Sequence, residues 1–132
     1  MARSVVIVDD SKFLLKQISD FFKNQLGFSV VAEGTDGDQA VALYRQYKPS
    51  LITLDITMPN KDGKTALEEI LKEFPDARVM MISAVKGPAM LECMAKGAKG
   101  YIEKPLKFGD DEFVKDVKAT VEEVFADTKP AS

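Results

Sequence analysis

Polar side chains that could carry out chemistry follow four short apolar runs in the sequence. They are Asp9 and Asp10 after residues 5–8, Asp55 after residues 51–54, Ser83 after residues 79–82, and Lys104 shortly after residues 100–102. Carboxylates that lie within several ångströms of one another repel strongly unless a cation neutralises them. An all-oxygen ligand set with room for water suits Mg²⁺, which typically binds one or two carboxylates together with a phosphate oxygen. If the runs converge, these residues predict a magnesium site that receives a phosphoryl group.

The remaining polar residues suit the transfer of that group. The Lys104 ammonium and the Ser83 hydroxyl are the kinds of donor that stabilise phosphoryl oxygens during transfer. Asp55 is then left as the nucleophile that accepts the group. Helix capping is the alternative for the carboxylates, because acidic residues commonly begin helices, and Asp10 suits that role in part.

The apolar runs are predicted to be five buried strands that end at these residues. Flanked by charged or turn-forming residues, they lie at 5–8, 29–32, 51–54, 79–82 and 100–102. Between them and after the last, apolar residues recur at helical spacing, and Pro88 stands at a predicted first helical position. Strands without alternating polar positions are typical of a parallel sheet with right-handed helical crossovers. The sequence therefore predicts an α/β fold, an open five-stranded parallel sheet with helices on both faces. Its ligand site is expected at the carboxyl ends of the strands.

Composition narrows the chemistry further. The chain has 132 residues, which is one ordinary domain, and no apolar run is long enough to cross a membrane. Its net charge of −3 gives no positive field to hold nucleic acid. Histidine is absent, which excludes Ser-His-Asp and Cys-His catalysis and a histidine phosphoacceptor. Cys93 is the single cysteine and is expected to be a small packed residue. With no signal-peptide pattern at the start, we expect a cytoplasmic protein without membrane insertion or direct nucleic-acid contact.

Six landmarks, taken in order and at this spacing, resemble one protein family. They are Val8-Asp9-Asp10-Ser11, Leu54-Asp55-Ile56-Thr57-Met58-Pro59, Asp62-Gly63, Ile82-Ser83-Ala84, Gly97-Ala98 and Gly100-Tyr101-Ile102-Glu103-Lys104-Pro105. No single landmark is specific, but together they are similar to the receiver domain of bacterial two-component response regulators, especially the single-domain chemotaxis type. The resemblance covers nearly the whole chain. We expect a receiver domain over residues 1–126 and a short polar tail over residues 127–132.

The resemblance implies a flavodoxin-like (βα)5 fold with strand order 2-1-3-4-5 and a phosphoaspartate at Asp55. The phosphoryl group would come from a phosphohistidine on a partner histidine kinase, and the absence of histidine in this chain agrees with a donor on another protein. Asp10 and Asp55 would bind Mg²⁺ directly, together with the backbone carbonyl of Thr57. Asp9 would act mainly through bound water.

The resemblance also implies a switch. Ser83 and Lys104 would bind the phosphoryl oxygens, and the loops that carry these two residues would move. The peptide bond between Lys104 and Pro105 would be cis. Tyr101 would be the rotating aromatic residue and would enter space vacated by Ser83. The surface of the fourth helix, fifth strand and fifth helix would then change shape and control an output partner, such as a flagellar motor switch. The alternative for Tyr101 is a strand aromatic packed at the edge of the sheet.

Two positions are predicted to set the lifetime of the phosphorylated state. In the family, the residues two after the acceptor and two after the hydroxyl residue influence how fast water removes the phosphoryl group. Here they are Thr57 and Val85. Neither side chain offers an amide or a carboxylate to orient an attacking water, so we predict slow self-dephosphorylation.

The leading hypothesis is a stand-alone, monomeric response regulator that controls a partner in trans. It would not be an enzyme, except that it would catalyse its own phosphorylation and dephosphorylation. A phosphate sink or a phosphorelay shuttle would use the same residues, and a phosphorylation-independent interaction module is the runner-up. A phosphatase of the haloacid dehalogenase type also uses a strand-end aspartate, Mg²⁺ and a lysine. Such an enzyme would need a general-acid aspartate where this chain has Thr57, and a cap insertion to enclose its substrate.

Overall fold

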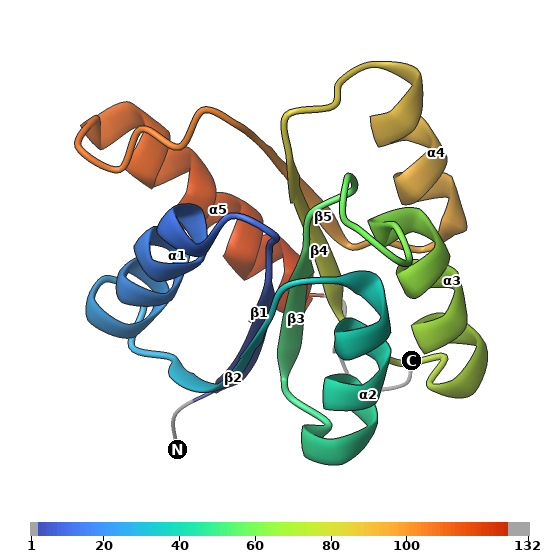
Figure 1. Ribbon diagram of the computed structural model, residues 1–132. Helices are drawn as coiled ribbons and strands as arrows, with labels where there is room; N and C mark the ends of the chain where they lie inside the picture. Colours follow the sequence, from blue (N-terminus) through green and yellow to red (C-terminus); the bar gives the residue numbers. More distant parts are fainter. Residues whose placement is uncertain (1–2, 127–132) are drawn as a thin grey trace.

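The computed structural model describes residues 3–126, which form an α/β/α sandwich (Figure 1). Within these residues strands and helices alternate along the chain. They are β1 (Ser4–Val8), α1 (Lys12–Asn24), β2 (Ser29–Gly34), α2 (Gly37–Tyr47), β3 (Leu51–Leu54), α3 (Gly63–Glu73), β4 (Val79–Ser83), α4 (Pro88–Lys96), β5 (Gly100–Glu103) and α5 (Asp111–Ala126). The strands form one parallel sheet in the order β2-β1-β3-β4-β5. The predicted five strand–helix units and the implied flavodoxin-like order are both confirmed. The predicted tail at residues 127–132 lies outside the described residues.

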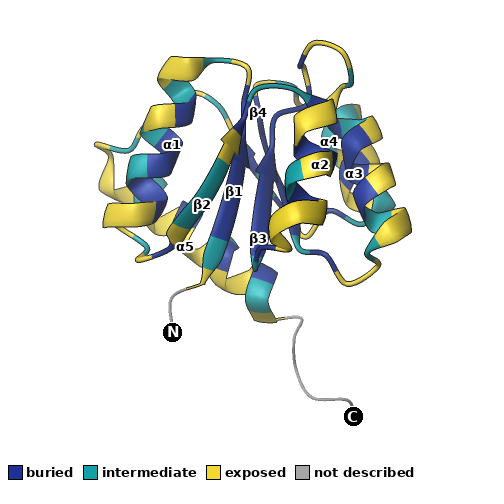
Figure 2. Ribbon diagram, turned by 60° about the horizontal axis from the view of Figure 1, so that its bottom comes forward, coloured by how far each residue is buried: buried dark blue, intermediate teal, exposed yellow. Residues whose placement is uncertain are grey.

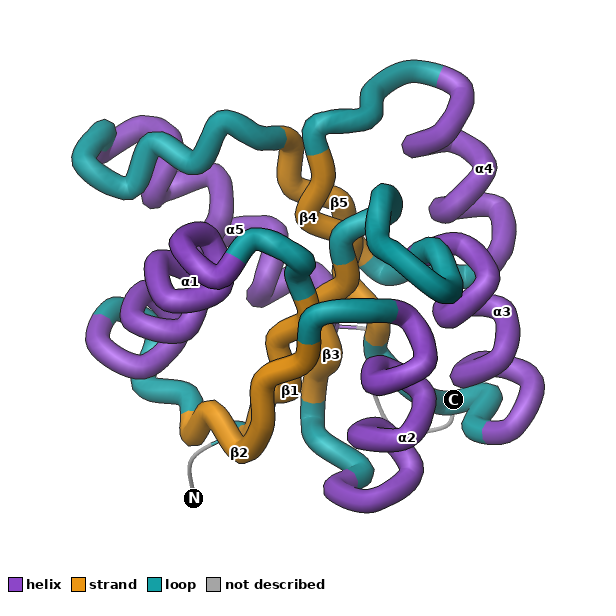
Figure 3. The backbone as a smooth tube through the Cα atoms, viewed as in Figure 1, coloured by secondary structure: helices purple, strands orange, loops and turns teal. Residues whose placement is uncertain are grey.

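The sheet separates two hydrophobic cores, one on each face (Figure 3). Alternate residues of β1 enter different cores because successive side chains of a strand point to opposite faces. Val6 and Val8 pack in the core covered by α2, α3 and α4. Val5 and Ile7 pack in the core covered by α1 and α5. The central strands are therefore buried on both faces, as their continuous apolar sequences predict.

The prediction of five buried strands is wrong for β2, at one edge of the sheet. In β5, at the other edge, Gly100 and Ile102 of the predicted run are buried and Tyr101 is partly buried. In β2, Ser29 and Glu33 are exposed, and the three residues after Ser29 are only partly buried (Figure 2). In β5, Glu103 is exposed, whereas every residue of β3 and β4 is buried. An edge strand has a neighbour on one side only, so solvent reaches side chains that a central strand would bury. An apolar run does not reveal which position its strand takes in the sheet.

Short polar residues fix the starts of the helices. The Asp36 carboxylate accepts a hydrogen bond from Gln39 N at 2.8 Å at the start of α2, and Asp62 accepts one from Thr65 N at 2.8 Å at the start of α3. Such caps satisfy N–H groups that have no partner within the helix. Pro88 is the first residue of α4, as predicted. Within residues 3–126, no helix has the length and apolar character needed to span a bilayer.

Candidate functional site

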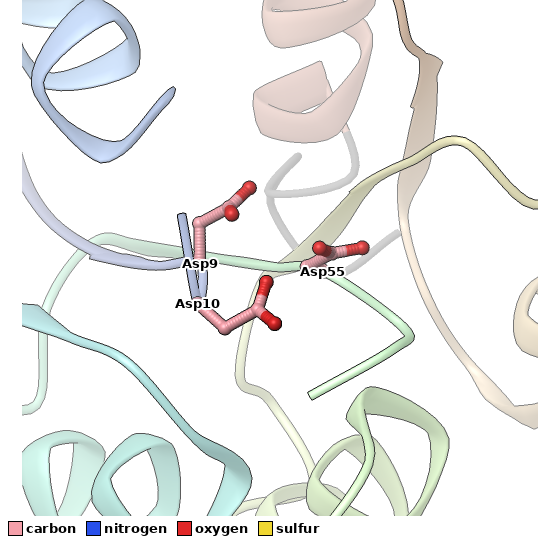
Figure 4. A group of neighbouring side chains, drawn as sticks. All are labelled: Asp9, Asp10 and Asp55. Carbon is pink, nitrogen blue, oxygen red and sulfur yellow. The ribbon is translucent and has the colours of Figure 1, made fainter. Parts of the chain in front are cut away.

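The predicted carboxylates converge at the carboxyl ends of β1 and β3. These two strands are neighbours in parallel register, and Asp55 N donates a hydrogen bond to Val8 O at 3.2 Å. Asp9 and Asp10 therefore lie beside Asp55 (Figure 4). One carboxylate oxygen from each of the three residues lies within 4.8 Å of the other two. The predicted cluster is present.

Lys104 reaches this cluster from the end of β5. Its Nζ lies 2.8 Å from Asp9 Oδ2 and 3.0 Å from Asp55 Oδ2, and 13% of its side chain is exposed. Burial alone would lower the pKa of Lys104, but the two carboxylates outweigh burial and leave the pKa raised. The side chain is therefore a fixed cation within the site. The expected cis peptide bond between Lys104 and Pro105 is present.

Asp55 is buried and held at both carboxylate oxygens. Its Oδ1 accepts a hydrogen bond from Ile56 N at 2.7 Å, while its Oδ2 accepts one from Lys104 Nζ. A carboxylate fixed in this way presents its oxygens in a set direction. This orientation suits a nucleophile that must meet an incoming group in line.

Asp9 and Asp10 differ in their surroundings. Asp9 is buried, which raises the pKa of its carboxyl despite the opposing effect of Lys104. Its Oδ1 accepts a hydrogen bond from Ser11 N at 2.9 Å. Asp10 is exposed, and the cap of α1 is Ser11, whose side chain accepts a hydrogen bond from Leu14 N at 3.3 Å. The capping role considered for Asp10 thus belongs to its neighbour.

The donor set fits a hard divalent cation. Asp9 Oδ2 is buried and accepts no well-directed hydrogen bond within residues 3–126, with the Lys104 ammonium as its ion-pair partner. Counted at their formal charges, three carboxylates and one ammonium carry a net charge of −2. All available donors are oxygens, and exposed Asp10 leaves the cluster open to water. Oxygen ligands with retained water are the surroundings that Mg²⁺ prefers.

Ser83 and Tyr101 meet at the end of β4. Ser83 is fully buried, and its hydroxyl accepts a hydrogen bond from Val85 N at 3.2 Å. The Tyr101 hydroxyl donates to the backbone carbonyl of Val85. Burial raises the pKa of Tyr101, and a hydrogen bond with Ser83 opposes that rise. The predicted rotating aromatic therefore already contacts the loop that follows Ser83.

Thr57 and Val85 lie in two different loops of the site. The Thr57 side chain is exposed in the loop between β3 and α3. Val85 is partly buried, and its side chain packs against the core under α2, α3 and α4. Its backbone, rather than its side chain, provides the contacts to Ser83 and Tyr101. No feature of the sequence predicts that backbone role.

Gly63 is a site residue whose role the sequence analysis missed. Its N donates a hydrogen bond to Ile56 O at 2.7 Å, which closes the base of the loop after Asp55. A Cβ at Gly63 would lie 1.9 Å from Asp55 O, so no larger residue fits without moving that backbone. In the sequence the pair Asp62-Gly63 is only one of the six landmarks, and the approach of Gly63 to Asp55 depends on tertiary packing.

Comparison with known proteins identifies the family. The family model described as response regulator receiver domain matches residues 5–118. The chain belongs to this family. Receiver domains of the type found here are signalling proteins rather than classical enzymes.

Several known receiver proteins are similar to this chain over most of their length. The chemotaxis protein CheY of Bacillus subtilis is 44% identical over 81% of this chain and 89% of its own. CheY of Thermotoga maritima is 39% identical over the same shares. A chain in the crystal structure of the CheX-CheY-BeF3-Mg²⁺ complex from Borrelia burgdorferi is 39% identical, with a TM-score of 0.84 over 93% of this chain and 89% of that one. The receiver domain described here is thus of the chemotaxis type.

Proposed function

We propose that this receiver domain is a phosphorylation switch in which Asp55 accepts a phosphoryl group from a partner histidine kinase in a Mg²⁺-dependent reaction. One observation carries the proposal. The buried carboxylate of Asp55 lies 3.0 Å from the Lys104 ammonium and within 4.8 Å of oxygens of Asp9 and Asp10. This arrangement places an anionic nucleophile between a fixed cation and an oxygen-ligand cluster.

The residues divide the work of transfer between them. The Asp55 carboxylate attacks phosphorus, and the phosphorus–nitrogen bond of the donor breaks as the new phosphorus–oxygen bond forms. The histidine of the donor leaves with the electron pair of the broken bond. Lys104 and Ser83 bind phosphoryl oxygens on which negative charge is spread, so both stabilise the transferred group. As the phosphoryl group arrives, Lys104 loses part of its ion pair with Asp55 and pairs with the phosphoryl oxygens instead.

Magnesium would be held by Asp10, Asp55 and the Thr57 backbone carbonyl, with Asp9 acting through water. Bound there, the ion supplies the positive charge that allows an anionic phosphoryl group to enter a cluster of carboxylates. The net negative charge of the cluster and its all-oxygen ligand set support this assignment. The similar chain from Borrelia burgdorferi was crystallised in a complex with BeF3 and Mg²⁺.

The output is proposed to be control of a protein partner in trans by the face of α4, β5 and α5. Phosphorylation at Asp55 would draw Ser83 and Lys104 toward the new group, and the loop after Ser83 carries the carbonyl that holds the Tyr101 hydroxyl. A change at Asp55 can therefore reach Tyr101 through one backbone segment. The relative from Borrelia burgdorferi binds CheX, which supports a protein output partner, and a flagellar motor switch remains a further candidate. We propose that residues 1–126 act in this way as a monomer in the cytoplasm, with residues 127–132 as a polar tail.

The phosphorylated state is proposed to be long-lived. The exposed Thr57 and the packed Val85 offer no carboxylate or amide side chain beside the phosphoryl group. Decay of the purified phosphoprotein tests this proposal, and Thr57→Asn together with Val85→Glu should speed it. An unchanged decay rate in that double variant would contradict it.

The acceptor is tested by intact mass after incubation with a small phosphodonor. Wild type should gain one phosphoryl group with Mg²⁺ present and none with a chelator, and Asp55→Asn should gain none. Because some receivers accept small donors poorly, a cognate kinase serves as the second donor. Failure with both donors, or binding of the output partner equally by Asp55→Asn, would favour a phosphorylation-independent interaction module.

A further inference from the structure

The loop between β3 and α3 is held by an element that supplies none of the proposed site residues. This loop starts after Asp55, carries Thr57, and is closed at its base by the hydrogen bond from Gly63 N to Ile56 O. Its outer part leaves the site and contacts the first turn of α2. The position of Thr57 is therefore set from two sides.

Three contacts join the outer part of the loop to α2. Gly37 N donates to Lys61 O at 3.0 Å, Asn60 Nδ2 donates to Asp36 Oδ2 at 2.8 Å, and Lys61 Nζ lies 3.1 Å from Asp38 Oδ1. We call these five residues the α2 clamp. A Cβ at Gly37 would lie 2.1 Å from Lys61 O, so the two backbones touch directly. The cap residue of α2 and the first two residues of the helix thus contact two consecutive residues of the loop, Asn60 and Lys61.

Lys61 is the most constrained member of the α2 clamp. Besides Asp38, its Nζ lies 2.6 Å from Glu69 Oε1 of α3, and 21% of its side chain is exposed. Hydrogen bonds from Lys61 to Glu69 and Asp38 raise its pKa, so the ammonium stays charged through the neutral range. One side chain therefore links the loop to the helix before it and the helix after it.

We propose that Asn60 and Lys61 are positioning residues that keep the Thr57 backbone carbonyl in place for Mg²⁺ by anchoring its loop to α2. The inference rests on the proposed function, because it requires the Thr57 carbonyl to be a ligand. Mg²⁺ demands nearly ideal octahedral geometry, so a ligand on a loose loop loses affinity by the cost of ordering that loop. Groups that orient a ligand commonly change metal affinity without touching the metal. The first turn of α2 then sets how tightly the site binds Mg²⁺.

The test removes the clamp contacts with little change of shape. Lys61→Met keeps most of the aliphatic stem and removes the ammonium, and Lys61→Arg restores a cation. Asn60→Gly tolerates the left-handed backbone at this position, where φ is 68°, and removes the amide. Lys96→Met is the matched control, because Lys96 Nζ lies 2.6 Å from Glu68 Oε2 and 30% of its side chain is exposed, but it joins α3 to α4.

Two properties of the full chain report on the clamp. NMR titration with Mg²⁺ gives the dissociation constant, and amide hydrogen exchange reports the opening of residues 56–62. Lys61→Met should raise the dissociation constant about three- to tenfold, with a larger rise when Asn60→Gly is added. Amide exchange across the loop should quicken. Lys61→Arg should recover the affinity, and Lys96→Met should leave it unchanged.

The outcomes separate the clamp from the proposed function. If wild type binds Mg²⁺ and the double variant Asn60→Gly, Lys61→Met binds it equally well, the positioning role of the α2 clamp is overturned and the proposed function stands. An equal loss of affinity in Lys96→Met also overturns the clamp, because the effect would then be general destabilisation. If wild type binds no Mg²⁺, the proposed function fails and the positioning role fails with it.

Discussion

A Cβ placed on Gly63 would lie 1.9 Å from the backbone oxygen of Asp55, so the first residue of α3 rests directly on the peptide group of Asp55. Gly63→Ala must push the two segments apart. Overpacking of this kind typically costs about 1–3 kcal/mol, and we expect a loss of this size in the free energy of unfolding, measured by urea denaturation. Phosphorylation of Asp55 should also slow, because its carboxylate is displaced from Lys104.

Gly109→Ala is the control for that substitution. In the described part of the chain, residues 3–126, no atom outside its chain neighbours lies within 4 Å of a Cβ at Gly109. Its stability and phosphorylation rate should match those of wild type within error. A Gly63→Ala variant that behaves like Gly109→Ala would show that the contact with Asp55 does not constrain the acceptor.

Magnesium should stabilise the folded chain. A ligand that binds only the native state adds about 2.7 kcal/mol when its concentration is a hundred times the dissociation constant. We therefore expect the Tm in calorimetry to rise with Mg²⁺ and to fall back with chelator. Asp10→Asn should lose most of this rise, whereas Asp116→Asn, an exposed change on α5, should keep it. A Tm that does not change when Mg²⁺ is added would contradict the proposed Mg²⁺ site.

The cap of α2 should make part of the stability dependent on pH. Hydrogen bonds from Gln39 N and then from the Asn60 amide lower the pKa of the Asp36 carboxyl. A carboxyl with a lower pKa in the folded state contributes stability that is present above its unfolded pKa and lost as the pH falls through the folded one. Asp36→Ala should cost about 1 kcal/mol near neutrality. The difference from wild type should narrow below about pH 4.

Asp36→Asn distinguishes the charge from the cap. It keeps an oxygen that can accept from Gln39 N but does not ionise, so its stability should lie between those of wild type and Asp36→Ala. Denaturation curves collected from pH 3 to pH 7 give the comparison. Parallel curves for wild type and Asp36→Ala across this range would show that the carboxylate charge plays no part.

The rate at which the Cys93 thiol reacts should report the opening of α4. Cys93 is the one buried residue of this helix, and burial raises the pKa of its thiol. The native thiol should therefore react slowly with a disulfide reagent. Two ion pairs join α3 to α4, Lys64 to Glu92 at 3.0 Å and Lys96 to Glu68 at 2.6 Å. Replacing both lysines with methionine should speed the reaction about two- to fivefold.

The reagent experiment has its own control. Lys16→Met removes an ion pair with Asp20 within α1, on the opposite face of the sheet from α4. It should leave the reactivity of Cys93 unchanged. A thiol that reacts equally fast in wild type and in the lysine variants would show that the ion pairs do not hold α4 closed.

The sequence was sufficient for the parts of the fold and site that follow from local pattern. Continuous apolar runs located the strands, and parallel topology then places Asp9 and Asp55 at the ends of neighbouring strands. The resemblance to receiver domains gave the strand order and the cis bond between Lys104 and Pro105. Each of these features depends on residues that lie close together in sequence or on one recurring topology.

Features that depend on contacts between distant side chains could not be predicted. The Lys61 ammonium pairs with residues of two helices, and Gly37 touches a backbone 24 residues away. The partial exposure of β2 follows from its place at the edge, which its apolar sequence does not encode. These features depend on tertiary packing, which periodicity and spacing do not specify.

Within residues 3–126, the two outer strands of the sheet, β2 and β5, each leave one side of their backbone without a neighbouring strand. Such a side offers N–H and C=O groups that a strand from another molecule could pair with, which is a route to aggregation. Each of these strands carries one charged residue, Glu33 in β2 and Glu103 in β5, and both are exposed. Two copies that approached edge to edge in parallel register would bring like charges together. Repulsion between these glutamates would oppose growth into continuous intermolecular sheets at high concentration.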